Sequence, residues 1–528
     1  MLPQIKEIVN RLNTLKYYLL AINILLISGL IFANNLGFLP FKNPGDFLFF
    51  VGVSFILALY RPGWSFLFFI GTIALENINL APVELGIMVR PYQLLGLTTF
   101  LAVGVRFITQ RLNFKLPQIS WSEYAVIVFV LGGFLGSLNA ANQALAIKQS
   151  IIVISFAGLY FLVRIFIQNL DDIKKIIPFF VSAAGTVVIY GIWQNIRFMH
   201  SQSHFEVMPG RINATFSEPD WLGIFLVFLL TVLYVMAYNF FSKMQLLKLK
   251  YSTYIFFYSC LTYFLITLTW VALILTVARS AWLGAAVVTG LILIYWALKV
   301  KVKLIVIILS SIVLAFGAVY FFKLTNFQLG NRVQSTTSGN QEITIACQRD
   351  VEIPQPIESV SELGQYACRH INLEELEAEA LAGKVIKKVY RKDPNFSIRK
   401  EIYVKSWGLL KHNWIFGIGW GNISDVLGKD ENGNGLNSSN LFLETWLGAG
   451  IFGLVALLSL MGYIIFRGKY FFLKKCWEGK FFREDSSFDF FYLFLILSAV
   501  AIVIPNLFNA GIMLGFLWVW MGVALAKR

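Results

Sequence analysis

The chain has 528 residues, of which 57% are hydrophobic and only 14% are charged. Soluble proteins carry about a quarter charged residues, so this composition excludes a water-soluble enzyme. It also excludes a disordered chain, because so much apolar surface cannot stay solvated. Four cysteines in the whole chain exclude a scaffold built on disulfides. The composition therefore predicts a polytopic membrane protein with polar insertions.

Apolar runs divide most of the chain into candidate membrane spans. A span needs about 20 mostly apolar residues to cross about 30 Å of hydrocarbon. Such runs lie at 17–34, 46–60, 64–80, 91–109, 123–139, 146–167, 174–195, 221–240, 253–277, 281–297, 303–322, 440–466, 490–506 and 508–526. The second and third are short enough to form a re-entrant pair. We expect an all-α polytopic membrane protein with about 14 transmembrane helices. Its expected divisions are 1–322 (helices 1–11), 323–439 (a large, partly helical extracytoplasmic loop) and 440–528 (helices 12–14).

The distribution of charge predicts which side of the membrane each loop faces. Lys6, Arg11 and Lys16 precede the first run, with no small-residue cleavage site after it, which predicts a retained cytoplasmic start. Alternating from there, the cytoplasmic side holds 24 of the 44 basic and 8 of the 29 acidic residues. This asymmetry follows the positive-inside rule. Anionic lipid head groups account for it, so we expect membrane lipids and no nucleic acid as partners, with both termini cytoplasmic.

The polar segment 323–439 interrupts the pattern and falls on the extracytoplasmic side. It carries 14 acidic and 14 basic residues, and a loop of this length is usually functional. Residues 372–391 have acidic residues in their first half and basic residues in their second, which predicts an amphipathic helix aligned with its dipole. Cys347 and Cys368 can form a disulfide there. Such a bridge, closing about 20 residues in an oxidising compartment, would contribute about 3 kcal/mol.

Three clusters of polar residues border the predicted spans on the extracytoplasmic side. The first precedes the eighth span and contains Arg211, Glu218 and Asp220, the last of which can cap the helix. The second, at 276–284, places Arg279 in a tight turn. A snorkelling arginine explains it simply, whereas its small neighbours indicate room beside the guanidinium. The third comprises 399–422 and 440–453, and its glycines are not a dinucleotide-binding fingerprint, because no strand precedes them.

Several arginines at one bilayer surface suit a bidentate grip on phosphate oxygens. The sequence has no HExxH motif, Cys/His quartet or Asp-rich motif. We therefore predict neither a metal nor a cofactor, and arginine would stabilise the phosphate charge alone. A lipid-linked diphosphate carries its phosphates at this depth.

Taken in order, the three clusters resemble the bacterial O-antigen ligase and Wzy-type polymerase superfamily. The features that carry the resemblance are Arg211 followed by Thr-Phe-Ser-x-Pro, the turn Ala-Arg-Ser-Ala-x-Leu-Gly around Arg279, the long polar loop, the segment 399–422 that ends in Gly-x-Gly-x-x-Asn, and the Asn-x-x-Leu…Gly-x-x-Gly element in 440–453. They cover roughly residues 200–465, and the first six spans carry almost no signature.

The resemblance implies an inverting, metal-independent membrane glycosyltransferase of the GT-C-like type, in the bacterial cytoplasmic (inner) membrane. Its donor would be a glycan on undecaprenyl diphosphate. Its acceptor would be a lipid-linked glycan for a polymerase, or a terminal acceptor such as a lipid A core sugar for a ligase. By this analogy Arg211 and Arg279 contact the diphosphate. The expected substrate-binding residues are Arg399, Lys400, Tyr403, Trp407, His412, Ser439 and Asn440.

One departure from the family pattern favours a polymerase over a ligase. Ligases of this family carry a histidine just before the Asn of the last element, and this sequence has Ser439 there. Serine cannot act as a base near neutral pH. The sequence leaves the base open among Glu218, Asp220, Glu401, His412 and Glu444.

The alternatives are a ligase of O-antigen or another surface glycan, and a membrane transporter or flippase. Against transport, the sequence shows no half-chain repeat. Apart from Arg164, we expect no charge at mid-span depth in the first six helices. The sugar, its linkage and the oligomeric state are not specified by the sequence.

Overall fold

The computed structural model describes residues 3–200, 210–246, 252–325, 340–358, 360–371, 376–392, 394–428, 435–481 and 486–526. The chain forms two compact units, one comprising Met1–Leu324 with Asn413–Arg528 and the other Thr325–His412. We describe each unit by itself.

The first unit is built almost entirely from apolar helices. Among the described residues, eleven helices are long and apolar enough to cross a membrane, and three shorter apolar helices accompany them. The long helices are α1 (Pro3–Asn35), α4 (Pro91–Ile108), α5 (Trp121–Leu138), α6 (Gln143–Phe166), α7 (Leu170–Met199), α8 (Pro219–Leu246), α9 (Ser252–Thr276), α10 (Arg279–Leu298), α11 (Val302–Phe321), α16 (Leu441–Trp477) and α17 (Ser487–Asn506). The shorter ones are α2 (Pro44–Tyr60), α3 (Pro62–Gly71) and α18 (Gly515–Ala524). This confirms a mostly helical, multi-pass membrane protein, but not the count of fourteen spans.

Two of the predicted spans are shortened by irregular backbone. The run 64–80 is helical only to Gly71, and the run 508–526 becomes an α-helix only at Gly515, after the 3-10 turn η4 (Gly511–Met513). Buried side chains replace the missing helical hydrogen bonds. Glu76 Oε1 accepts from the Gly515 amide at 2.7 Å, and Asn506 Oδ1 accepts from the Gly511 amide at 2.9 Å. Such partners are required wherever backbone lies in an apolar interior without helical bonds.

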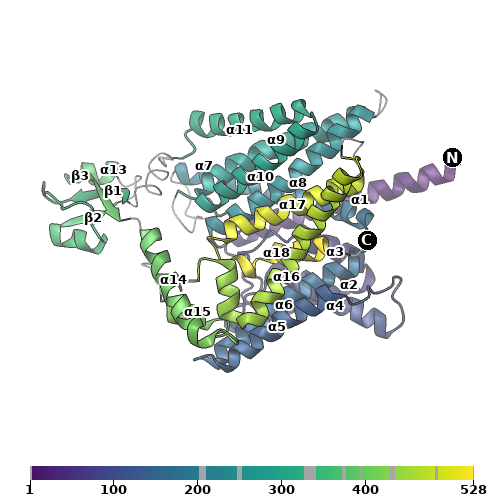
Figure 1. Cartoon of the computed structure of the whole chain (residues 1–528), viewed down its shortest axis with the longest axis horizontal. Helices are drawn as coiled ribbons and strands as arrows, with labels where there is room; N and C mark the ends of the chain where they lie inside the picture. Colours follow the sequence, from purple (N-terminus) through teal and green to yellow (C-terminus); the bar gives the residue numbers. More distant parts are fainter. Residues whose placement is uncertain are drawn as a thin grey trace. The chain divides into compact units, whose positions relative to one another are not determined.

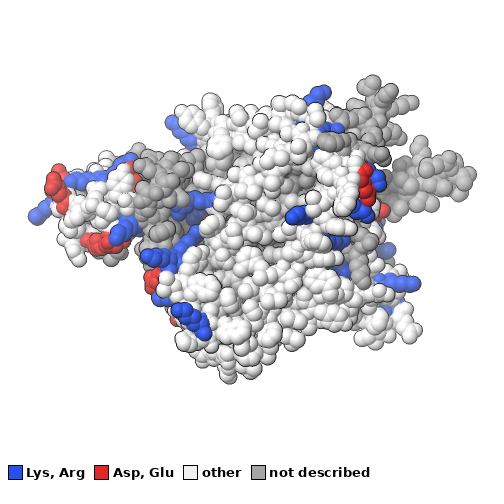
Figure 2. Space-filling model, in the orientation of Figure 1, with Lys and Arg blue, Asp and Glu red and all other residues white. Residues whose placement is uncertain are grey.

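The helices pack in groups that bring distant parts of the sequence together. α8 packs against α9, α10 and α17, while α5 packs against α16, and α6 against α18 (Figure 1). Figure 2 shows that most of the surface of this unit in that view carries neither basic nor acidic side chains. A surface of this kind is typical of helices in contact with lipid.

The second unit contains a small antiparallel sheet of order β2-β1-β3. Its strands are β1 (Asn340–Cys347), β2 (Cys368–His370) and β3 (Val385–Lys392), and its helical elements are η2 (Val360–Tyr366), α13 (Leu376–Leu381) and α14 (Pro394–Asn413, whose last residue is counted with the first unit). Cys347 and Cys368 lie directly opposite each other and form a disulfide. The bridge lies in a small apolar core with Ile343, Ile345 and Val389.

The predicted amphipathic helix over 372–391 is wrong. Residues 372–375 lie outside the described residues, α13 ends at Leu381, and the basic half is strand β3. Gly383, with φ +75°, stops the helix in the left-handed region that glycine tolerates. The residues after it include Val385, Ile386 and Val389, whose β-branched side chains favour a strand. Pairing along the whole of β1 stabilises that choice.

Candidate functional site

Arg211 lies in the loop before α8, which is hydrogen-bonded to the end of α9. Ile212 in this loop donates its amide to Leu275 O, near the end of α9, at 3.3 Å. The Arg211 guanidinium donates from Nε to Thr276 O at 2.9 Å. It also pairs with Asp220, in the first turn of α8, through Nη2 and Oδ2 at 3.1 Å. The Arg211 side chain remains 19% exposed.

These contacts bring the first two sequence clusters together. Thr276 is the last residue of α9, and Arg279, three residues later, is the first residue of α10. Both arginines therefore start from adjacent backbone at the same end of the first unit, which we call the Arg211 end. Arg279 is partly buried.

Two of the small residues beside Arg279 contribute to helix packing, and the predicted room beside the guanidinium stays a prediction. Ala278 and Ala281 are fully buried. A Cβ added to Gly223 of α8 would lie 2.7 Å from the Ala281 Cβ and 3.0 Å from the Ala278 Cβ. Their size therefore lets the start of α10 approach α8 closely.

The segment after α17 connects the second cluster to the third. Asn509 Nδ2 donates to Ser280 Oγ at 2.9 Å, and Asn440 Nδ2 donates to Leu507 O at 3.0 Å. Asn440 also caps α16, because its Oδ1 accepts from the amides of Phe442 and Leu443. Asn440 thus lies at the Arg211 end, joined to the start of α10 through residues 507–509.

A carboxylate in the first turn of α16 holds the turn that precedes this helix. Glu444 Oε2 accepts from the Ser438 amide at 2.7 Å. Ser439 adopts φ +51° and donates its amide to Asn437 Oδ1 at 2.9 Å. Ser439 and Glu444 are both partly buried here. Glu444 therefore has a structural partner in the turn before α16, and a catalytic role for it stays a prediction.

Glu218 is partly buried in the same loop as Arg211, and its carbonyl accepts from the Leu222 amide at 3.1 Å at the start of α8. Asp220, in the first turn of α8, pairs with Arg211 through its carboxylate. That pairing favours a positioning role for Asp220.

The remaining predicted residues lie on α14, in the second unit. Ile402, Ser406 and Leu410 are spaced four apart and buried, and they define one face of the helix. The predicted substrate-binding residues of α14 lie on other faces and are exposed or partly buried: Arg399, Lys400, Tyr403, Trp407 and His412. Glu401 is also exposed, and pairs with Lys405 at 2.7 Å.

The glycines at 417–421 are structural. Gly417, with φ +72°, lies so close to α16 that an added Cβ would be 2.4 Å from Leu447 O. Trp420 is buried, and an added Cβ on Gly448 would meet its ring at 2.3 Å. Asn422 exchanges two hydrogen bonds with the backbone of Asn142, at 2.8 and 3.2 Å. This part of the third cluster locks α16 to α5 and α6.

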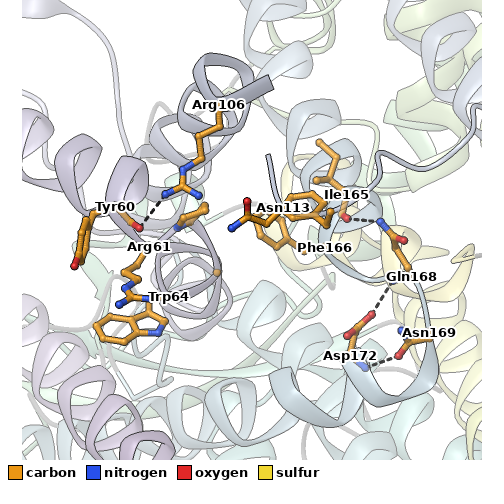
Figure 3. A pocket seen from close by; sticks show the side chains of 13 residues that line it. Tyr60, Arg61, Trp64, Arg106, Asn113, Ile165, Phe166, Gln168, Asn169 and Asp172 are labelled. Carbon is orange, nitrogen blue, oxygen red and sulfur yellow. Dashed lines mark hydrogen bonds between the residues drawn. The ribbon is translucent and has the colours of Figure 1, made fainter. Parts of the chain in front are cut away.

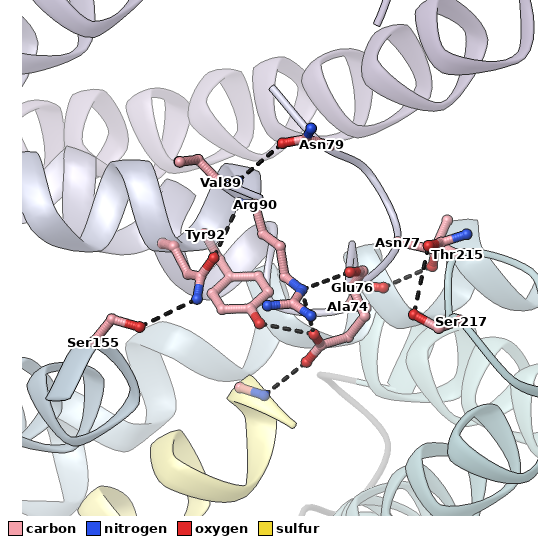
Figure 4. Close-up of polar contacts among 12 residues, drawn as sticks. Ala74, Glu76, Asn77, Asn79, Val89, Arg90, Tyr92, Ser155, Thr215 and Ser217 are labelled. Carbon is pink, nitrogen blue, oxygen red and sulfur yellow. Dashed lines mark hydrogen bonds and ion pairs between the residues drawn. The ribbon is translucent and has the colours of Figure 1, made fainter. Parts of the chain in front are cut away.

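The buried carboxylate of Glu76, near the loop that carries Arg211, was not expected from the sequence. Glu76 is fully buried. Its carboxylate forms an ion pair with Arg90, with Oε2 3.1 Å from Nε, and accepts hydrogen bonds from Tyr92 OH at 2.8 Å and from the Gly515 amide (Figure 4). The adjacent Asn77 donates its amide to Thr215 O at 2.8 Å. Glu76 therefore helps to fix the segment that contacts the Arg211 loop, and its place inside a predicted apolar run was the signal that could have revealed it.

A second buried ion pair lies at the opposite end of the helices. Glu123 Oε1 and Arg164 Nε are 2.7 Å apart, and their side chains are only 7% and 3% exposed. Tyr160 OH also donates to Glu123. Besides Arg164, which the sequence analysis singled out, Glu76 and Glu123 are buried carboxylates in this part of the chain.

Among the described residues, no three His, Cys, Asp or Glu side chains come together as metal ligands. The Arg211 end instead offers guanidinium groups, amides and hydroxyls. Such groups suit an anion that bears several oxygen atoms.

Comparison with known proteins agrees with the resemblance noted in the sequence. No curated protein and no solved structure matches the chain. A family model described as O-antigen ligase matches residues 263–458. The matched segment includes Arg279, α14 and the Asn440 element, and it begins after Arg211. Residues 263–458 are therefore similar to this family, which confirms the resemblance to the O-antigen ligase and polymerase superfamily.

Proposed function

We propose that this protein is an inverting, metal-independent glycan polymerase of cell-surface polysaccharide assembly. It would transfer a glycan from undecaprenyl diphosphate to a lipid-linked acceptor glycan, on the outer face of the bacterial cytoplasmic membrane. The family match supports a membrane enzyme of the O-antigen ligase or polymerase type in general. The specific donor, acceptor and side of the membrane are our inference.

The observation that carries the proposal is the hydrogen bond that joins Arg211 to the end of α9, three residues before Arg279. The hydrogen bond from Arg211 Nε to Thr276 O holds the two arginine-bearing segments together, and Asp220 orients the guanidinium from α8. Two arginines on fixed backbone can face the two phosphates of one diphosphate. Guanidinium groups grip phosphate oxygens in a bidentate manner that lysine cannot reproduce.

The chemistry follows from stabilising the leaving group. An acceptor hydroxyl attacks the anomeric carbon while the bond from that carbon to the diphosphate oxygen breaks. The electron pair leaves with undecaprenyl diphosphate, and the arginines stabilise the charge that develops there. Preorganised donors of this kind lower a barrier by several kcal/mol. The hydroxyl proton passes to a base, and the pairing of Asp220 with Arg211 supports a positioning role for Asp220.

We favour a polymerase over a ligase because of Ser439. This residue stands where ligases of the family carry a histidine, and its amide is engaged by Asn437. A serine hydroxyl does not accept a proton near neutral pH. A lipid-linked acceptor that is already held beside the donor suits a site without that histidine.

The test is to incubate purified protein with a defined undecaprenyl-diphosphate oligosaccharide and to resolve the products by length. A ladder of extended glycans is expected. A single transfer to a different membrane lipid would identify a ligase instead. Absence of any product, with protein that is folded and monodisperse, would contradict the proposal and favour transport.

A further inference from the structure

A cavity of the first unit lies far from Arg211, at the other end of the helices. Its volume is about 560 Å³. It is enclosed by the turn between α2 and α3, the end of α4 and the connection from α6 to α7 (Figure 3). Since Arg90 begins α4 beside Glu76 and Arg106 lies in its last turn, the length of α4 separates this cavity from the Arg211 end. We call it the Arg61 pocket.

Two arginines give the Arg61 pocket its positive charge. Arg61 is exposed, and its guanidinium carbon lies 5.0 Å from the centre of the Tyr60 ring and 5.4 Å from that of Trp64. Within the described parts of the chain, no acidic side chain forms an ion pair with Arg61. The rings therefore orient a guanidinium whose charge is unneutralised.

Arg106 is held against the end of α2. Its Nε donates to Leu59 O at 2.9 Å and its Nη2 to Tyr60 O at 3.1 Å. These bonds satisfy carbonyls at the end of α2 and place the charge at the pocket wall. A carbonyl carries no full charge, so the positive charge of Arg106 remains.

The acidic residue of the pocket is already engaged. Asp172 lies on the side opposite the two arginines (Figure 3). Its Oδ2 accepts from the Gln168 amide at 3.2 Å, and its Oδ1 pairs with Lys175 at 2.9 Å. Lys175 offsets its charge, so the pocket as a whole attracts anions.

Apolar stripes on two neighbouring helices run toward this charge. On α2 the exposed side chains Phe49, Val53, Ile56 and Tyr60 follow one face, at spacings of three and four. On α4, which packs against α2, the exposed Leu97, Leu101, Val105 and Ile108 do the same. The stripe on α2 ends at the turn that carries Arg61. The stripe on α4 ends in the last turn of that helix, where Arg106 lies.

We propose that the Arg61 pocket binds the phosphate of an anionic diacyl phospholipid. The acyl chains would lie along the stripes of α2 and α4, and Arg61 with Arg106 would hold the phosphate at the membrane surface. A soluble phosphate compound would use the same two arginines but not the stripes, so the two ligands can be distinguished. This site is independent of glycan transfer at the Arg211 end.

The test uses purified, delipidated full-length protein and native mass spectrometry with dioleoyl phosphatidylglycerol. We expect one tightly retained lipid, and dioleoyl phosphatidylcholine binding more weakly. Arg61→Gln should weaken phosphatidylglycerol binding about tenfold, the effect of losing a charge-assisted contact. The matched control is Arg111→Gln, which removes an exposed arginine from the same end of α4 outside the pocket and should leave binding unchanged.

Two results would overturn the proposal. Equal lipid affinity in Arg61→Gln and wild-type protein would show that the pocket does not hold the head group. Displacement of the lipid by sn-glycerol 1-phosphate at comparable concentration would show a site for a soluble phosphate instead. Arg61→Lys provides a second variant, in which charge and folding are kept but the planar fork is lost, and it should bind with intermediate affinity.

Discussion

Two ion pairs of the helical unit have the same chemistry and opposite settings. Arg164 and Glu123 are 2.7 Å apart, and their side chains are 3% and 7% exposed. Arg211 and Asp220 are 3.1 Å apart, and their side chains are 19% and 28% exposed. The first pair is closed to any ligand, whereas the second can be reached from outside. The comparison teaches that burial separates charges that hold the bundle together from charges that are available to a substrate.

The largest expected effect is on catalysis at the partly exposed Arg211 and Arg279. Arg211→Ala and Arg279→Ala should each abolish chain extension, a loss of at least about a hundredfold, since each removes charge stabilisation of the leaving group. Product ladders from purified protein measure this. Protein levels in the membrane should be unchanged, and long glycans made by either variant would refute the assigned role.

Breaking the buried pair of Glu123 and Arg164 should lower the stability of the protein, whereas the changes at Arg211 and Arg279 should lower its activity. Glu123→Gln leaves the Arg164 charge buried without its partner, which costs about 3–5 kcal/mol. We expect less folded protein and a lower melting temperature. Asp220→Asn is the matched control, because breaking a partly exposed pair costs only about 1 kcal/mol or less. Equal melting temperatures for the two variants would contradict the distinction.

In the second unit the disulfide between Cys347 and Cys368 is expected to stabilise the fold, as the buried ion pair does in the first unit. Replacing Cys347 and Cys368 by serine removes the bridge between β1 and β2 and should destabilise this sheet by about 3 kcal/mol. Hydrogen exchange of the strand amides measures the loss, and exchange in the helical unit should not change. A mass increase on reduction and alkylation of the native protein checks that the bridge exists, and two free thiols would exclude it.

Substituting lysine for Arg211 or Arg279 should have a smaller effect and distinguishes the contribution of charge from that of guanidinium geometry. Arg211→Lys and Arg279→Lys keep the positive charge but lose the bidentate fork, so activity should fall about tenfold. Initial rates at saturating donor provide the measurement. If the lysine variants are fully active, charge alone suffices and the fork has no role.

The smallest effect is expected for Asp220, which orients Arg211. Asp220→Asn should lower activity only a few-fold, because the amide oxygen can still accept a hydrogen bond from the guanidinium. The loss should lie mainly in KM for the donor. A loss as complete as that of Arg211→Ala would instead assign Asp220 to proton transfer.

Hydropathy predicted nearly all helices because apolar length is a local property of the sequence. The ends of two predicted spans could not be predicted, since their irregular backbone depends on Glu76 and Asn506, whose partners are remote or lie across a turn. The strand β3 was missed for a similar reason. Its charge pattern resembles that of a helix, and only pairing with β1, some 45 residues away, favours a strand.

The candidate site was predictable in its composition more than in its geometry. Arg211 and Arg279 stood out as charges beside apolar runs, and the structure joins their segments. The packing of Ala278 and Ala281 against Gly223 of α8 could not be predicted, because this contact is invisible in the sequence. Glu76 was overlooked inside an apolar run, although with its three partners it helps to fix the segment that contacts the Arg211 loop.

Binding of undecaprenyl diphosphate tests most directly whether Arg211 and Arg279 hold the leaving group. Its affinity for wild-type, Arg211→Ala, Arg279→Ala and Arg61→Gln protein can be measured by native mass spectrometry in one detergent. We predict at least a tenfold loss in each of the first two variants and none in the third. Unchanged affinity in both Arg211→Ala and Arg279→Ala would contradict the account.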